Sequence, residues 1–281
     1  MFFSDEFYFQ QIDKALENSN IISTKDYPRI VIFSDCHRGA GTWNDSFLNN
    51  KTIYEAAMSY YYDGGFCYIE LGDGDELWEN RRFSDIQEIH KDIFNILKRF
   101  EKEKRLFMLW GNHDRIKEKT NPLSPMLPVC SESLIIQNPE NGCRFNLIHG
   151  HQVDPLNNQF WKLARWLVRY FWKPLELSGI KDPTSSARNY GKRKAVETRM
   201  SNWAKYHNTN LISGHTHRPT IPPPGSTSGY YNSGSCVHPD TITCIEIVNG
   251  QITLIKWAAC ADDNLYIKVC RYVLGGPTNL P

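Results

Sequence analysis

Five short polar motifs in this chain of 281 residues contain the residue types that bind divalent metal ions. In chain order they read SDCHRG (34–39), GDGDELWEN (72–80), GNHDR (111–115), HGHQVD (149–154) and SGHTHRP (213–219). Carboxylate oxygens, imidazole nitrogens and an amide oxygen, without thiolate, suit Mn, Fe, Zn or Co. Two such ions roughly 3.5 to 4 Å apart supply a nucleophile and neutralise phosphoryl charge, so the motifs indicate phosphoester hydrolysis.

Each motif directly follows an apolar run of the kind that forms a buried strand: 30–33, 67–71, 106–110, 145–148 and 210–212. Because ligands collect beyond the carboxyl ends of strands in sheets covered by helices, we expect the five motifs to converge on one site. Helical patterns at 50–62 and 84–103 lie between the strands and predict an α/β fold. Segments 241–248 and 251–257 flank Asn249-Gly250 and predict an antiparallel hairpin.

The spacing within the motifs indicates how the ligands are shared. Asp35 and His37 lie two residues apart beyond a strand, where period-two geometry places both side chains on the same side, and His215 and His217 repeat this spacing. Asp73 lies between two glycines that allow close approach, so it is the natural carboxylate to bridge two ions.

Three further residues have more than one interpretation. Asn112 is either a metal ligand or a turn former after Gly111, and His149 and His151 compete for one ligand role, which His149 fits because it directly follows the strand. Cys36 lies between two ligands, but alternation points it away, so we expect a buried thiol.

The five motifs in this order resemble the signature of the calcineurin-like metallophosphoesterases. The matching residues are Asp35-x-His37, Gly72-Asp73-x-x-Glu76, Gly111-Asn112-His113-Asp114, His149-Gly150-His151 and Gly214-His215-x-His217, which span about residues 30–217. The resemblance implies an α/β fold in which a two-sheet β-sandwich is flanked by helices, as four α/β/β/α layers. The whole chain, 1–281, is expected to be a single domain.

The resemblance also implies a ligand set for two divalent ions, with Mn favoured. One ion is expected on Asp35, His37, Asp73 and His217, and the other on Asp73, Asn112, His149 and His215. A metal-bound hydroxide is expected to attack phosphorus in line.

By the same resemblance His113 protonates the leaving oxygen, with a nearby carboxylate that orients its ring. Glu76 or Asp114 is the expected carboxylate, and Asp75 is a competing candidate, because many members have Asp where Glu76 stands.

Four residues are expected to contact the substrate. Asn112 and His151 are assigned to phosphate or leaving-group contact. Arg38 and Arg115 directly follow ligand motifs and are candidate phosphate clamps, with surface salt bridges as the alternative.

Residues 152–205 interrupt the strand pattern and predict a helical cap insertion. On the predicted helix 160–173, Lys162, Arg165, Arg169 and Lys173 form a basic stripe among aromatic and apolar residues. This helix either packs on the core with the stripe solvated, covers the metal site, or contacts a membrane surface or lipid. From 162 to 199 there are ten basic and three acidic residues, which suits a polyanionic substrate such as a nucleotide or diphosphate.

The arrangement is also distantly similar to the UDP-diacylglucosamine pyrophosphatase branch of the family. That branch has Arg where His113 stands and Asp where His151 stands, so its substrate does not transfer. We therefore expect hydrolysis of a phosphomonoester, phosphodiester or pyrophosphate bond in a small substrate. The alternatives are a protein phosphatase and a non-catalytic metal-binding scaffold or membrane-surface adaptor.

Composition limits the partners and the compartment. The chain has 32 basic and 31 acidic residues, so no nucleic-acid partner is expected, and the oligomeric state stays open. The N-terminus does not read as a signal peptide, and no run reaches the roughly 18 apolar residues of a membrane span. The eight cysteines lack Cys-x-x-Cys pairs, which predicts reduced thiols in a cytoplasmic protein.

Overall fold

The structure is a computed structural model that describes residues 3–42, 45–119, 127–172, 189–223, 225–226 and 229–279. Its strands are β1 (Asn20–Ser23), β2 (Arg29–Phe33), β3 (Cys67–Leu71), β4 (Leu106–Leu109), β5 (Ser133–Gln137), β6 (Arg144–Ile148), β7 (Asn210–Ser213), β8 (Gly229–Asn232), β9 (Thr241–Val248), β10 (Gln251–Ala261) and β11 (Ile267–Asn279). Its α-helices are α1 (Asp5–Leu16), α2 (Lys51–Asp63), α3 (Phe83–Ile89), α4 (Lys91–Lys102), α5 (Pro155–Asn158), α6 (Trp161–Leu167) and α8 (Tyr190–Tyr206). Short 3₁₀ turns are η1 (Leu48–Asn50), η2 (Arg115–Glu118) and η3 (His151–Val153), and η4 (Val168–Trp172) is π-helical.

The strands form two mixed sheets. One has the order β11-β10-β9-β2-β3-β4 and the other the order β1-β5-β6-β7-β8. Strands β2, β3 and β4 are parallel to one another, as are β6, β7 and β8. The carboxyl ends of the strands that precede the five motifs therefore lie at the edges where ligands collect.

An apolar layer holds the two sheets face to face. It includes Ile32, Ile69 and Ile245 from the six-stranded sheet and Leu134, Leu147 and Ile212 from the five-stranded sheet. Alternate residues of β2, Val31 and Phe33, point the other way and pack with α2 and α4. Strand β2 is thus buried on both faces, which explains its continuous apolar sequence.

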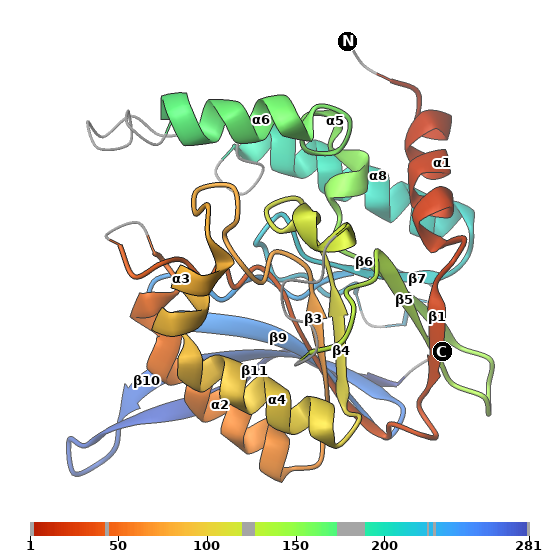
Figure 1. The fold of residues 1–281 in the computed structure, drawn as a ribbon. Helices are drawn as coiled ribbons and strands as arrows, with labels where there is room; N and C mark the ends of the chain where they lie inside the picture. The colour runs from red at the N-terminus through yellow and green to blue at the C-terminus, as the bar shows by residue number, and fades with distance from the viewer. Residues whose placement is uncertain are drawn as a thin grey trace.

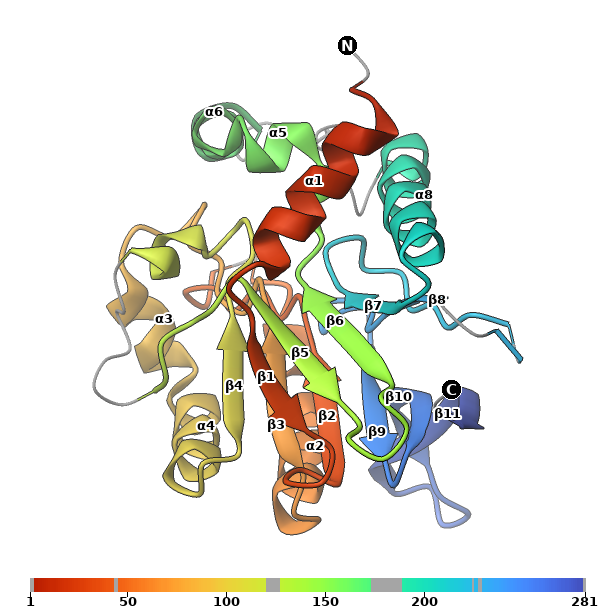
Figure 2. The same ribbon diagram turned by 90° about the vertical axis from the view of Figure 1, so that its right-hand side faces the viewer.

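Helices cover the outer face of each sheet. Helices α2, α3 and α4 contribute to the apolar cluster on the six-stranded sheet, and α1 and α8 to the cluster on the five-stranded sheet. Figure 2 shows α1 and α8 on the side of β5, β6 and β7. The layers are α/β/β/α, so the predicted sandwich fold is confirmed.

The predicted elements match the observed ones closely where a local signal exists. Strand β3 has the predicted bounds, and Asn249 and Gly250 join β9 to β10 with φ of 49° and 74°, the left-handed pair that a tight hairpin requires. The predicted helix 84–103 is instead two helices, because it breaks at His90, whose ring bonds the Gly39 carbonyl and the Asp45 carboxylate.

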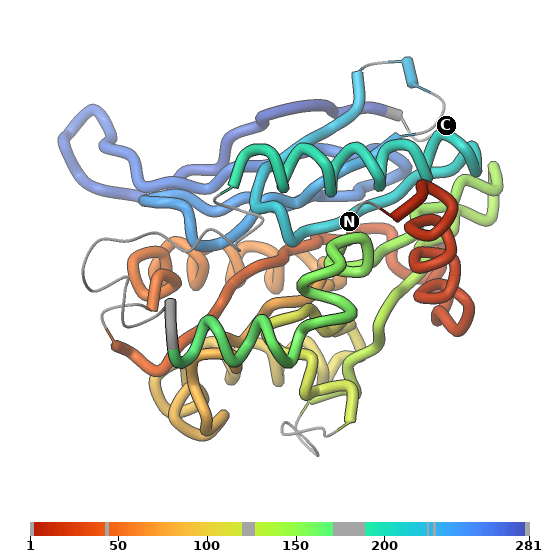
Figure 3. The backbone as a smooth tube through the Cα atoms, turned by 90° about the horizontal axis from the view of Figure 1, so that it is seen from above, coloured from red at the N-terminus to blue at the C-terminus, as the bar shows by residue number. Residues whose placement is uncertain are grey.

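The predicted insertion 152–205 divides into two parts with different positions. Helix α8 packs against β7, β8 and α1, so it belongs to the outer helical layer. Helices α5 and α6 lie above the ends of β3 and β4 (Figure 1). From above, α8 lies on the side of the blue C-terminal strands and α6 on the side of α3 and α4 (Figure 3). Only 155–172 therefore forms a cap among the described residues, and Lys173 of the predicted stripe lies outside them.

Helix α6 is covered by the rest of the protein on one side only. Its Ala164 is buried with Val168 of η4 against Trp78, but Phe160, Leu163, Trp166 and Tyr170 are half exposed. No helix within the described residues is long and apolar enough to cross a membrane.

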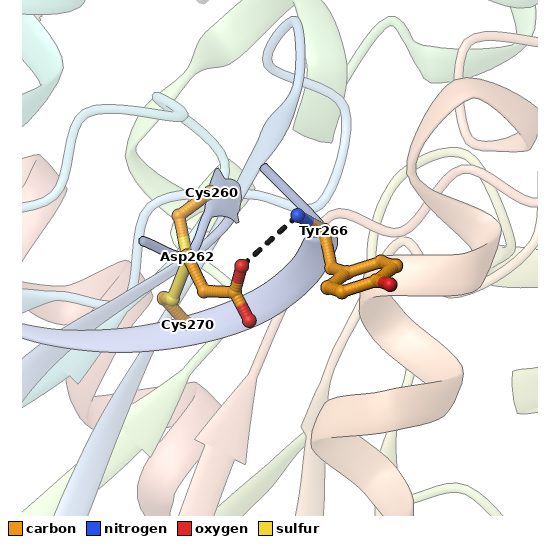
Figure 4. Close-up of a disulfide and its surroundings, with 4 residues drawn as sticks. All are labelled: Cys260, Asp262, Tyr266 and Cys270. Atoms are coloured by element: carbon orange, nitrogen blue, oxygen red, sulfur yellow. Dashed lines mark hydrogen bonds between the residues drawn. A yellow bond between two sulfur atoms is a disulfide. The ribbon is translucent and has the colours of Figure 1, made fainter. Parts of the chain in front are cut away.

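One cysteine pair differs from the prediction of reduced thiols. Cys260 and Cys270 form a disulfide between β10 and β11, beside a loop in which Asp262 accepts a hydrogen bond from the Tyr266 N–H (Figure 4). The antiparallel pairing of β10 with β11, which the sequence analysis did not predict, brings the two residues together. Cys36 and the other described free cysteines are buried thiols.

Replacing Ile32 by Ala tests the layer between the sheets. Ile32 has no exposed surface, so we expect a loss of about 2–5 kcal/mol in the free energy of unfolding, because the surrounding strands cannot close the cavity. The control is Ile21→Ala in β1, where the side chain is 57% exposed and the expected loss is under about 1 kcal/mol. Chemical denaturation measures both, and equal losses would contradict the assigned core.

Candidate metal centre

Main-chain hydrogen bonds hold the motif loops together beyond the strand ends. The N–H groups of Asp35 and His37 donate to the carbonyls of Gly72 and Asp73, which continues the parallel pairing of β2 with β3. Hydrogen bonds also cross between the sheets, among them the His215 N–H, which donates to Asp35 Oδ2 at 2.9 Å, and His149 Nδ1, which lies 2.9 Å from the Leu71 carbonyl. The two sheets are therefore tied at the point where the motifs meet.

Five predicted ligands adopt left-handed backbone conformations. They are Asp35, His37, Asp73, His215 and His217, with φ between 47° and 65°. Such conformations are uncommon for residues other than glycine and concentrate at functional sites. A left-handed turn brings Asp35 and His37 to one side. The prediction that strand alternation does so was wrong.

The first predicted ligand group converges on one point. Nε2 of His217 lies 3.1 Å from Asp35 Oδ1 and 3.3 Å from Nε2 of His37. The distance from His37 Nε2 to Asp35 Oδ1 is 3.7 Å. These donor atoms are close enough to share one cation.

The second predicted group is Asp73, Asn112, His149 and His215, and the donor atoms of Asp73, His149 and His215 lie close together. His149 Nε2 is 3.1 Å from Asp73 Oδ2. His149 Nδ1 is occupied by the Leu71 carbonyl, so Nε2 is the ring nitrogen that faces the carboxylate and would bind a cation. Asp154 Oδ2 lies 3.3 Å from His215 Nε2 and helps to orient that ring.

Asp73 lies between the two groups. Its Oδ2 is 3.1 Å from His149 Nε2 and 3.8 Å from His37 Nε2, so one carboxylate faces an imidazole of each group. Its Oδ1 accepts a hydrogen bond from the His113 N–H at 2.8 Å. This is the position that a bridging ligand requires.

Unpartnered buried donor atoms show that the residues fit a pair of cations. Within the described residues, Asp35 Oδ1, Asn112 Oδ1 and His149 Nε2 are buried and make no hydrogen bond. A buried polar atom without a partner costs about 1–3 kcal/mol, and metal coordination would satisfy all three. The Asn112 side-chain oxygen therefore remains available to a cation.

The electrostatic field of the site also favours cations. Burial lowers the pKa of His149, but the carboxylates of Asp73 and Asp35 more than offset it and raise this pKa to about 9. A field that holds a proton on a buried imidazole equally favours a divalent ion.

Two glycines allow the ligand carboxylates to lie close to the backbone. A Cβ at Gly111 would lie 2.1 Å from Asp73 Oδ1, and a Cβ at Gly214 would lie 2.4 Å from Asp35 Oδ2. The glycines of GNHD and GHTH thus have a steric role in placing the two carboxylates.

Glu76 connects a predicted ligand with the predicted proton donor. Its Oε2 lies 3.0 Å from His37 Nδ1, and its Oε1 lies 2.9 Å from His113 Nδ1. One carboxylate thus fixes both rings and leaves both Nε2 atoms free to face the site. Trp78, which the sequence analysis did not single out, stacks on the His113 ring at 4.3 Å between centroids.

Arg38, Asp75 and Asp114 lie elsewhere, and their predicted roles were wrong. The Arg38 guanidinium is fully buried and pairs with Glu70 at 2.7 Å and Asp75 at 2.8 Å, so it cannot reach a substrate phosphate. Lys117 pairs with both Asp75 and Asp114. These carboxylates are committed to a buried ionic network and do not orient His113.

Two other predicted substrate contacts have different outcomes. His151 is fully buried, and its ring lies 5.6 Å from the His149 ring between centroids. The prediction that His151 contacts the substrate phosphate directly was therefore wrong. Arg115 lines the same cavity as Asn112 and His113, and donates to Asn158 rather than forming only a surface ion pair.

A sequence profile of the calcineurin-like phosphoesterases matches residues 28–219. The chain belongs to this family. The match covers all five motifs, so the predicted resemblance is confirmed. No curated protein shows significant sequence similarity to the chain.

Solved structures with a similar fold include two from eukaryotes. A dimetal phosphatase from Danio rerio is 12% identical, with a TM-score of 0.45 over 80% of this chain and 94% of that chain. Vps29 from Chaetomium thermophilum is 12% identical, with a TM-score of 0.39 over 90% of this chain and 100% of that chain.

Replacing Arg38 by Gln tests its structural role. Because Glu70 and Asp75 would keep buried charges without their cation, we expect a loss of about 3–5 kcal/mol in unfolding free energy. The control Arg82→Gln removes an exposed i,i+3 pair with Asp85 and is expected to cost under about 1 kcal/mol. A fully stable Arg38→Gln protein would restore Arg38 as a candidate for substrate contact.

Proposed function

We propose that this family member hydrolyses a phosphomonoester, phosphodiester or pyrophosphate bond of a small substrate with two divalent metal ions. The observation that carries the proposal is the position of Asp73, whose Oδ2 faces imidazoles of both ligand groups while its Oδ1 binds the His113 N–H. A proton donor is thus held directly beside the bridging carboxylate.

The metal ligands in this proposal are Asp35, His37 and His217 for one ion, Asn112, His149 and His215 for the other, and Asp73 for both. When bound, the ions supply Lewis-acid neutralisation of the phosphoryl oxygens and activate water. Oxygen and nitrogen donors without thiolate suit Mn, Fe, Zn or Co, and of these Mn is the ion that we propose.

His113 is suited to donate a proton to the leaving oxygen. Burial lowers its pKa, but the carboxylates of Glu76 and Asp73 more than offset this effect and hold the pKa above the ordinary value for histidine. The raised pKa favours the protonated ring, and Glu76 occupies Nδ1, so Nε2 is the nitrogen that would donate the proton.

The cap favours a small leaving group. Arg169 of η4 donates to the carbonyls of Trp78 and Leu77 at 2.6 and 3.0 Å, which fastens the cap to the loop beside His113. A phosphorylated loop of a folded protein would have to displace this segment, whereas a small molecule would not.

Replacing Asp73 by Asn tests the bridge. The change removes the charge shared by both groups, so we expect metal content to fall from about two ions per chain to below one, and turnover of p-nitrophenyl phosphate or bis-p-nitrophenyl phosphate to fall to background. Elemental analysis after Mn²⁺ supplementation measures the metal. Asp262→Asn, in the β10–β11 loop, is the control, and two retained ions in Asp73→Asn would refute the bridge.

Replacing His113 by Ala should lower kcat by roughly 10²-fold or more while both ions stay bound. The control is His207→Ala, at the end of α8 away from the motifs, which should leave kcat unchanged. Loss of metal in His113→Ala would instead make His113 a ligand.

Replacing Glu76 by Gln tests the pairing that raises the His113 pKa. A general acid works only while protonated, so kcat falls as pH rises through its pKa. Without the Glu76 charge this pKa drops, and the alkaline limb of the pH profile should move to lower pH. The profile is recorded at saturating Mn²⁺ because Glu76 also holds His37. If the alkaline limb did not move, His113 could not be the acid whose pKa sets that limb.

A further inference from the structure

A cavity of about 450 Å³ lies beside His113 and Asn112, between the loop after β3 and the cap. Four arginines line it: Arg81, Arg115, Arg165 and Arg169. They come from three separate segments of the chain, and Arg165 and Arg169 are two members of the basic stripe that the sequence predicts on the cap helix.

No aspartate or glutamate lies among the described residues that line this arginine pocket. Arg81 donates to the Tyr170 hydroxyl, and Arg169 donates to two main-chain carbonyls, all of which are neutral. The Arg165 guanidinium lies 4.9 Å from the centre of the Trp161 ring. Among these four arginines, Arg115 is the one with an ion pair to a described residue, at 3.5 Å from the exposed Glu118.

Within the part of the chain that the structure describes, few carboxylates therefore balance the positive charges of the pocket. Partial burial, together with the neighbouring Arg165 and Arg81, lowers the pKa of Arg169 below its usual range. Grouping like charges in a partly enclosed cavity is unfavourable unless an anion joins them. A guanidinium offers two parallel N–H donors that match the oxygens of phosphate.

The position of the pocket assigns this anion to one end of the substrate. The scissile phosphate belongs at the ligand groups, and His113 faces the leaving oxygen under the proposed function. The pocket opens from His113 and Asn112 toward the cap, so it receives what lies beyond that oxygen.

We propose that the arginine pocket binds a second phosphate carried by the leaving group, so that the substrate bears two phosphates, one on each side of the bond that breaks. This inference rests on the proposed hydrolase function. The aromatic rings of Trp78 and Trp161, which also line the pocket, offer flat surfaces for the remainder of the leaving group.

The reaction balances without any further reactant. Water gives up one proton to solvent, and its oxygen forms the new bond to the scissile phosphorus. The bond from phosphorus to the bridging oxygen breaks with its electron pair on the leaving phosphate. His113 donates a proton to that oxygen and is reprotonated from solvent, while the arginines neutralise the phosphate that departs.

The first test measures inorganic phosphate binding to the full chain by calorimetry, without added metal. Under these conditions the carboxylates of the metal centre repel phosphate, so binding reports the arginines. Arg165→Gln should weaken binding at least about 10-fold, the loss expected for a charge-assisted hydrogen bond. Lys162→Gln is the matched control, since Lys162 is on the same helix and lies near the same Trp161 ring but does not line the pocket.

The second test compares two substrates with Mn²⁺: diadenosine diphosphate, whose leaving group carries a phosphate, and p-nitrophenyl phosphate, whose leaving group does not. Arg165→Gln should lower kcat/KM for the diphosphate at least about 10-fold more than for p-nitrophenyl phosphate, whereas Lys162→Gln should leave the ratio unchanged.

Equal losses on both substrates would overturn the assignment to the leaving group. Absence of phosphate binding by the unmodified chain, or equal binding by Arg165→Gln, would overturn the pocket itself. Failure to hydrolyse any phosphorylated substrate would instead overturn the proposed function, and the calorimetry would still decide whether the pocket binds phosphate.

Discussion

The architecture depends on holding the carboxylates of Asp35 and Asp73 close together, away from water, among several imidazoles. Neither carboxylate is more than 2% exposed, and each faces histidines from both sheets. Such an arrangement is unfavourable by itself, because it concentrates charge and requires left-handed backbone at five ligands, at about 1–3 kcal/mol each. The apolar layer between the sheets and the bonds that cross it hold these loops in place, and divalent cations would complete the balance of charge.

The surroundings of the ligands are organised in two ways. On the open side, Glu76 fixes the His37 and His113 rings at once, so under the proposed function metal binding and proton donation would depend on the same carboxylate. On the buried side, Arg38 and Lys117 neutralise a set of carboxylates that has no access to solvent. The acidic residues of GDGDE and GNHD therefore have two kinds of position. Some face the candidate site, and the others are committed to the buried ionic network.

Under the proposed function, the cap connects the core to substrate choice. The cap packs on Trp78, and Arg169 fastens it to the loop that carries Glu76. It also brings arginines to the side of His113 where the leaving group would lie. Within the described residues, the basic excess seen between 162 and 199 is thus divided: part faces the pocket, and part lies on α8, where Arg199 bonds the Val153 carbonyl and stabilises the outer layer.

Sequence alone determined the features that depend on local pattern: most of the strands that precede the motifs, the Asn249-Gly250 hairpin, the candidate ligand residues that the structure brings together, and the family. Only the tertiary structure decided which carboxylate meets His113, that Arg38 and His151 are buried, that Cys260 joins Cys270, and that Arg81 and Arg115 meet the cap arginines. The physical reason is the distance along the chain over which each signal acts. Strand periodicity and turn chemistry act over a few residues, whereas pairing between side chains tens of residues apart is set by sheet register and by depth of burial, which no local spacing encodes.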